Sequence, residues 1–150
     1  ECALDQGSIL AGGNRRDLCE LELELKKGAP DTLLDWARAL AGQVPMFLNL
    51  ISKAEQGYAL AGLHQPVPLN DKEPLVNRVF HGLSRAWLSD TVDAALADDL
   101  DNLQHRDGVP ANELAWLRER LDSGDTIAEL AAGSTRLGQL QLSLLALQDL

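Results

Sequence analysis

Three glutamates alternate with leucines in one short stretch of this 150-residue chain. The stretch runs from Cys19 to Leu25, and its carboxylates belong to Glu20, Glu22 and Glu24. Successive side chains of a β-strand point to opposite faces, so the three carboxylates share one face at intervals of about 7 Å. Mg²⁺ and Mn²⁺ prefer carboxylate oxygens and also bind phosphate. The pattern therefore fits a divalent-metal site, and it equally fits a half-exposed strand with leucine inside and glutamate in water.

The segments around this strand predict a small sheet interrupted by one helix. Short apolar stretches over 2–10, with a turn signal at 5–7, indicate a hairpin that closes near 11–13. A Gly-Ala-Pro-Asp sequence ends the acidic strand and begins a helix over about 31–41. The segment 52–60 is interpreted as another short strand. The predicted order is strand, strand, strand, helix, strand.

The second half of the chain predicts helices only. A proline-bearing linker over 66–74 separates a first domain, 1–65, from a helical region, 75–150. Helical periodicity over 75–103 indicates one long helix or two that meet near Ser89, and a further helix follows Pro110. Asp125 is expected to cap a short helix. The last helix opens at Ser134 and stays apolar to the final residue, so its apolar face needs a partner within the chain or outside it.

Three segments of the first domain together resemble the C-terminal half of CYTH domains, the triphosphate tunnel enzymes. The segment 1–7 resembles the family strand that ends in an Asp-x-Gly turn, and 19–25 resembles its acidic strand. The segment 52–60, Ser-Lys-Ala-Glu-Gln-Gly-Tyr-Ala-Leu, resembles its closing Ser-Lys-x-x-x-Gly-Tyr element. Their joint occurrence in this order is more specific than any one motif. The resemblance implies an α+β chain with antiparallel strands from a tunnel-type sheet, followed by helices.

The resemblance also implies the chemistry and the residues that perform it. It implies metal-dependent hydrolysis of inorganic triphosphate or another polyphosphate, with Mg²⁺ or Mn²⁺ as cofactor. Glu22 and Glu24 take the catalytic positions, and these two residues, Glu20 and Asp5 become the metal ligands. Lys53 becomes a phosphate contact. Metal and lysine would offset the charge on the transferred phosphoryl group, while the carboxylates fix the metal.

Parts of the CYTH pattern are missing from this sequence. The N-terminal strand with a Glu-x-Glu-x-Lys signature that opens the family domain, ahead of the segments quoted above, is absent, as are the central strands that carry most of its lumen arginines. We therefore expect the isolated chain to hydrolyse triphosphate weakly or not at all, and to need pairing with a missing N-terminal half. The alternative is a non-catalytic relative that serves as a polyphosphate-binding module, as a scaffold or as a homo-oligomer formed through the last helix.

The helical region resembles a shortened CHAD domain, a helical polyphosphate-binding module that follows the CYTH domain in several bacterial proteins. Arg78, His81 and Arg85 are three and four residues apart, so they share a helix face and could form an anion contact. The other interpretation is a partly exposed helix edge with a histidine at the margin of the core.

Composition narrows the set of partners and the compartment. The chain has 13 basic and 23 acidic residues, for a net charge of −10, which argues against nucleic acid or an anionic membrane as partner. Its apolar runs are too short to cross a bilayer. Cys2 and Cys19 are expected to be reduced, buried thiols, and the protein to be cytoplasmic.

Overall fold

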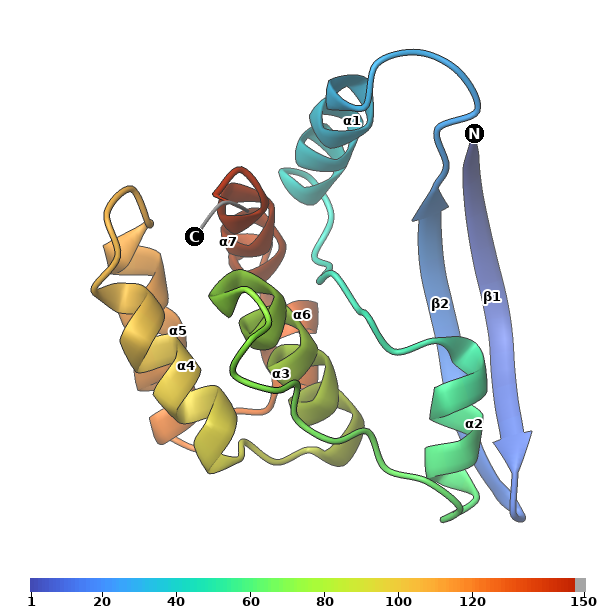
Figure 1. Ribbon diagram of the computed structural model, residues 1–150. Helices are drawn as coiled ribbons and strands as arrows, with labels where there is room; N and C mark the ends of the chain where they lie inside the picture. The colour runs from blue at the N-terminus through green and yellow to red at the C-terminus, as the bar shows by residue number, and fades with distance from the viewer. Residues whose placement is uncertain (148–150) are drawn as a thin grey trace.

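The computed structural model describes residues 1–147 and contains a β-hairpin and seven helices within them (Figure 1). The strands are β1 (Cys2–Ala11) and β2 (Asn14–Leu23). The helices are α1 (Asp31–Ala41), α2 (Lys53–Leu60), α3 (Leu75–Ser89), α4 (Ala94–Gln104), α5 (Ala111–Asp122), α6 (Ile127–Gly133) and α7 (Arg136–Leu145). The predicted α+β class is confirmed. The hairpin and α2 stand on one side, and α3 to α7 form a helical group on the other.

The hairpin is longer and simpler than the sequence pattern predicts. β1 runs unbroken through 5–7, so the turn predicted there is wrong, and the chain reverses at Gly12 and Gly13. Both glycines have positive φ angles, 59° and 80°, which favour glycine over residues with a Cβ atom. β2 ends at Leu23 rather than at residue 25. Within residues 1–147 these two antiparallel strands make up the sheet.

The glutamate face of β2 is the more covered face of the hairpin. Glu20 is half-buried and lies on the side of α2, whereas the neighbouring Leu21 is exposed. The arrangement with leucine inside and glutamate in water is therefore wrong for this part of the strand. Cys2 and Cys19 are free, but both are exposed, so the prediction that they are buried is wrong.

The segment 52–60 forms helix α2, so the predicted closing strand is wrong. Ser52 caps the helix: its hydroxyl accepts from the Glu55 amide, and the Glu55 carboxylate accepts from the Ser52 amide. This reciprocal capping box satisfies two backbone N–H groups that would otherwise lack partners. The Ser-x-x-Glu spacing was a readable helix signal, and Lys, Ala, Glu and Gln all favour helix over strand.

The main hydrophobic core lies among the helices after residue 74. Helix α3 contacts α4, α6 and α7, and its apolar face is fully buried. Two helices rather than one cover 75–104, because Asp90 ends α3 in the left-handed conformation, with φ 55°. The predicted helix after Pro110 is confirmed as α5. The core residues from these helices are Leu75, Val76, Val79, Phe80, Leu83, Ala86, Leu96, Leu100, Leu103, Leu114, Leu117, Leu121, Ile127, Leu130, Ala131, Leu137, Leu140 and Leu144.

The last helix finds a partner for its apolar face inside the chain. Leu137, Leu140 and Leu144 of α7 are buried against the other helices, and α1 packs on α7 as well. The predicted extension of this apolar face to Leu150 lies outside the described residues. No helix within residues 1–147 is long and apolar enough to cross a membrane.

The segment between α1 and α2 is fixed to the helical group by polar contacts. The Gln141 side chain accepts from the Leu48 amide at 2.7 Å and donates to the Leu48 carbonyl at 3.0 Å. The Leu50 amide donates to Ser84 Oγ at 2.9 Å. A Cβ atom on Gly138 would lie 2.7 Å from the Met46 carbonyl oxygen, so only glycine allows this close approach. These contacts hold the segment that leads into α2.

Candidate functional site

Three carboxylates meet on the covered face of the hairpin. The strand register pairs Asp5 with Glu20 and Ala3 with Glu22, which places all three acidic side chains on the same face. One oxygen from each of Asp5, Glu20 and Glu22 lies within 4.8 Å of the others. Three of the four predicted metal ligands are therefore brought together. The pairing of β1 with β2 does this, and the sequence of β2 alone does not determine that pairing.

Lys53 places its ammonium group among these carboxylates. Its Nζ atom lies 2.8 Å from Asp5 Oδ2, 2.6 Å from Glu22 Oε1 and 2.8 Å from Glu20 Oε2. The first two contacts are hydrogen bonds, and the third is an ion pair without hydrogen-bond geometry. Hydrogen bonding to Asp5 first, and then the contacts with Glu20 and Glu22, raise the pKa of Lys53, so its amine stays charged.

Helix α2 lies close across the hairpin and so positions Lys53. A Cβ atom on Gly57 would lie 3.5 Å from Ile9 of β1, and the Asn14 side chain donates to the Leu60 carbonyl at 3.1 Å. Lys53 is the first residue of α2, where the helix dipole disfavours a positive charge. The three carboxylates offset that unfavourable position.

Glu24 is not part of the cluster. It follows the end of β2, where its carboxylate lies 2.6 Å from Lys26 Nζ and its backbone pairs with Glu1. The catalytic and metal-binding roles predicted for Glu24 stay predictions. The roles predicted for Asp5, Glu20, Glu22 and Lys53 stay predictions too, but these four residues share one site.

Arg16 connects the hairpin to the helical group, and the sequence reasoning missed it. Its guanidinium donates to the Leu88 carbonyl at 3.0 Å and lies over the Trp87 ring, 4.9 Å from the ring centre. Trp87 in turn contacts Phe47. The alternation of β2 was a signal for Arg16, because Arg16 is four residues before Glu20 and six before Glu22 and therefore lies on the same face of the strand.

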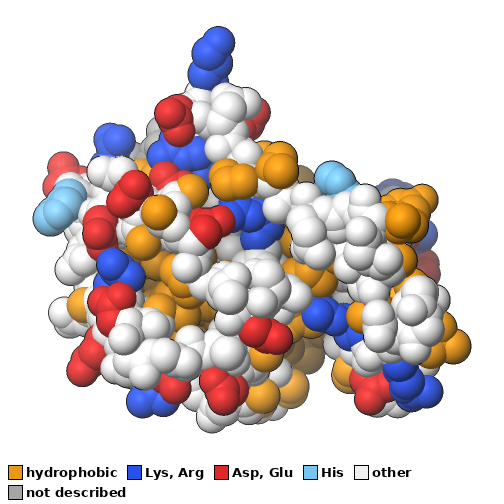
Figure 2. Space-filling model, turned by 90° about the horizontal axis from the view of Figure 1, so that it is seen from below, with side chains coloured by type: hydrophobic (Ala, Val, Ile, Leu, Met, Phe, Trp, Pro, Cys, Tyr) orange, Lys and Arg blue, Asp and Glu red, His pale blue; other side chains and the backbone are white. Residues whose placement is uncertain are grey.

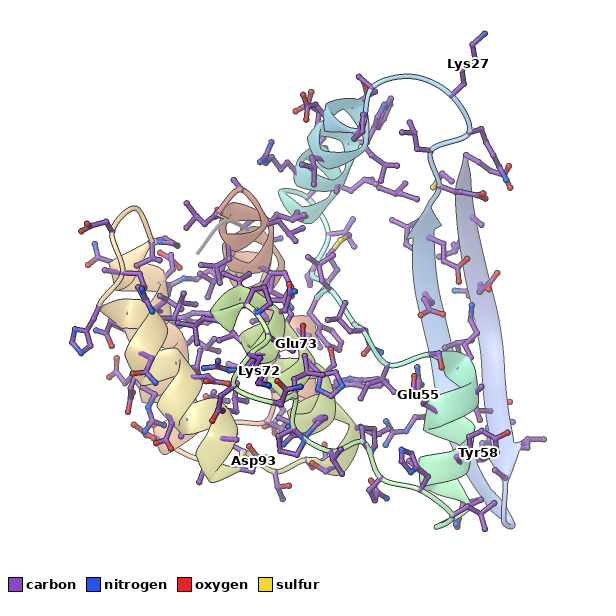
Figure 3. All side chains as sticks on the ribbon, in the orientation of Figure 1. Lys27, Glu55, Tyr58, Lys72, Glu73 and Asp93 are labelled. Carbon is purple, nitrogen blue, oxygen red and sulfur yellow. The ribbon has the colours of Figure 1, made fainter. Side chains whose placement is uncertain are left out.

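The three residues of the predicted anion contact lie on α3, but the guanidinium groups of Arg78 and Arg85 already have acidic partners. Arg78 forms a two-pronged ion pair with Asp99 of α4, with Nε 3.0 and 3.2 Å from the two carboxylate oxygens. Arg85 pairs with Asp93, which begins α4 (Figure 3). An anion would have to displace these aspartates, so the anion contact stays a prediction.

His81 is a partly buried residue of α3, and the charges of Arg85 and of Glu55 from α2 act on it. Burial first, and then the neighbouring Arg85, lower the pKa of His81, while Glu55 opposes them. Its Nδ1 atom is shielded from solvent and has no hydrogen-bond partner among the described residues. The fold therefore favours the neutral imidazole.

We expect acidification to destabilise the protein through His81. The unfolded chain protonates this histidine near pH 6.5, whereas the folded chain does so only at lower pH, so stability falls as the pH drops through that window. His81→Gln should flatten this slope in urea unfolding midpoints. The exposed-site control His105→Gln should keep it. Glu55 does not contribute to this slope. Because the folded state lowers the pKa of Glu55, the stabilisation that Glu55 provides is lost only below about pH 4.5. An unchanged slope in His81→Gln would contradict the assignment.

The donor set of the cluster suits a hard divalent cation. Mg²⁺ and Mn²⁺ take oxygen ligands, and opposite ligands of Mg²⁺ lie about 4.2 Å apart, close to the spread of the three carboxylate oxygens. Glu20 Oε2 is shielded from solvent and forms an ion pair with Lys53 at 2.8 Å, so a divalent cation at this oxygen would take the place of an ammonium. Chemically, the site can hold a divalent cation, an ammonium group, or each in turn.

The site is thus an acidic cluster on a β-hairpin with one lysine at its centre. Among known proteins, the chain is similar to an inorganic triphosphatase of Haemophilus influenzae, with 38% identity over 60 residues. The match covers 40% of this chain and 17% of that protein's length. No family model matches the chain, and no solved structure matches it.

Proposed function

We propose that this chain carries one wall of the active site of a metal-dependent triphosphatase of the CYTH kind. The observation that supports this most is the meeting of Asp5, Glu20 and Glu22 with Lys53 on one face of the hairpin. The identity with an inorganic triphosphatase over 60 residues supports it independently. The tunnel-type sheet, the CHAD-like helical region and a cytoplasmic location belong to the same proposal.

Each residue of the cluster has a physical role in this proposal. Asp5, Glu20 and Glu22 would hold Mg²⁺ or Mn²⁺, which when bound offsets negative charge on the transferred phosphoryl group. Lys53 would pair with the phosphate chain of an inorganic triphosphate or another polyphosphate. The carboxylates keep the cation in place, and the charged ammonium orients the substrate toward it.

The hairpin alone does not surround a substrate. Both outer edges of the two-stranded sheet lack strand partners within residues 1–147, so strands from elsewhere would complete the enclosure. We therefore expect slow hydrolysis of triphosphate by this chain. The alternative is a non-catalytic role as a polyphosphate-binding module or scaffold. A failure of Mn²⁺ to bind at the cluster would favour this alternative.

Glu22→Gln should weaken Mn²⁺ binding by at least about tenfold, because it removes one charged oxygen ligand of the proposed site. Calorimetric titration of the chain with Mn²⁺ measures this, and phosphate release from triphosphate with Mg²⁺ or Mn²⁺ measures the residual activity. Glu73→Gln is the matched control, since Glu73 lies in the segment before α3 (Figure 3). Equal affinities in Glu22→Gln and the unaltered chain would refute the proposed site.

A further inference from the structure

The ammonium of Lys53 lies where the three carboxylates converge. Its distances of 2.6 to 2.8 Å to Asp5, Glu20 and Glu22 place it in contact with every carboxylate of the cluster. The ammonium donates hydrogen bonds to Asp5 and Glu22 and forms an ion pair with Glu20. Without another cation, Lys53 is the group that offsets the repulsion among the carboxylates.

A divalent cation and the Lys53 ammonium cannot use the same oxygens at once. The three ligand oxygens lie within 4.8 Å of one another, and Mg²⁺ binds oxygen at about 2.1 Å, so both cations would have to lie between the same atoms. They would also repel each other at contact distance. Binding of a divalent cation to Asp5, Glu20 and Glu22 therefore requires Lys53 to leave.

Lys53 has the freedom to leave, but its charge then needs another partner. Its side chain is 37% exposed, and its ammonium lies at the end of a flexible four-carbon stem. Its backbone is held at the start of α2, so the amine can move only within reach of the same face of the hairpin. A phosphate group bound beside the cation would supply the new negative partner.

We propose that Lys53 couples the binding of the divalent cation to the binding of the phosphate substrate. Lys53 competes with the cation when substrate is absent, and it pairs with the phosphate chain when both bind. Each ligand therefore raises the affinity for the other, as reciprocal linkage requires. This inference depends on the proposed function, and it adds that Lys53 acts as a switch between two partners as well as a phosphate contact.

The test is a Mn²⁺ titration of the chain and of Lys53→Met, with and without inorganic triphosphate. Calorimetry and thermal stability are the readouts, and protein-free titrations correct for Mn²⁺ that triphosphate binds itself. We expect Lys53→Met to bind Mn²⁺ alone about tenfold or more tightly than the unaltered chain. Triphosphate should raise the Mn²⁺ affinity of the unaltered chain by about 5-fold to 100-fold, and it should raise that of Lys53→Met by a clearly smaller factor, because only the direct contact between cation and phosphate remains there.

Controls separate this inference from the proposed function. Lys27→Met removes an exposed lysine outside the cluster (Figure 3) and should behave like the unaltered chain. Lys53→Gln is the second variant if Lys53→Met does not fold, and it should show the same gain. If Mn²⁺ binds and Glu22→Gln abolishes binding, but Lys53→Met binds Mn²⁺ no more tightly, the switch is wrong and the site stands. If neither the chain nor its Lys53 variants bind Mn²⁺, both proposals fail.

Discussion

Replacing Leu83 with alanine is expected to lower the free energy of unfolding by about 2 to 5 kcal/mol. Leu83 is 1% exposed and belongs to α3, the helix that contacts α4, α6 and α7. The substitution removes buried methyl groups and leaves a cavity that the surrounding helices can close only in part. Urea unfolding measures the effect as a lower midpoint with an unchanged slope.

Leu63→Ala is the matched control for the Leu83 variant. It makes the same chemical change at a side chain that is 75% exposed, so stability should change by less than about 0.5 kcal/mol. The Leu83 prediction fails if the two variants unfold at the same urea concentration. That result would mean that the helical group after residue 74 is not the main source of stability.

Gln141→Leu is expected to lower the free energy of unfolding by about 2 to 4 kcal/mol, although it places an apolar side chain of similar size in a buried position. The Gln141 amide bonds both the N–H and the C=O of Leu48, so leucine would leave two partly buried backbone groups without partners. Burial removes water from such unpaired groups without supplying another hydrogen bond, and this destabilises the folded state. The measurement is again urea unfolding.

Ser143→Ala provides the control on the same helix. Ser143 is exposed, and its hydroxyl donates to the Gln139 carbonyl one turn earlier in α7. We expect this variant to stay within about 0.5 kcal/mol of the unaltered chain. A Gln141→Leu variant as stable as Ser143→Ala would show that the segment 46–51 is not held by these hydrogen bonds.

The site depends on few contacts outside its own hairpin. α2 is preceded by the segment that Gln141 and Ser84 hold to the helical group, and β2 reaches that group through Arg16. On the face shown in Figure 2, basic side chains lie scattered among acidic ones, without one continuous basic surface. The prediction that the chain does not bind nucleic acid agrees with this face and stays a prediction.

The helical region was predictable because its signals are local. Leucines at helical spacing, Pro110 before a helix and Gly124 after it determine α5 through interactions within a few residues. The alternation of β2 likewise determined that Glu20 and Glu22 share a face. The α2 error has a local cause as well: the Ser52 and Glu55 capping signal for a helix was present in the sequence, but the segment was interpreted as a strand.

Tertiary structure decided which face of the hairpin is covered and where Lys53 lies. Alternation groups side chains by face, but a strand carries no local signal for which face another element will cover. Asp5 and Glu22 lie 48 and 31 residues from Lys53 in the sequence, and they meet it only because the hairpin register and the packing of α2 bring them together. The sequence alone determined that Glu20 and Glu22 form a row of acids. Whether that row faces water, a metal or a lysine was decided by contacts between distant parts of the chain, since an ion pair at 2.6 to 2.8 Å requires each backbone to be fixed first.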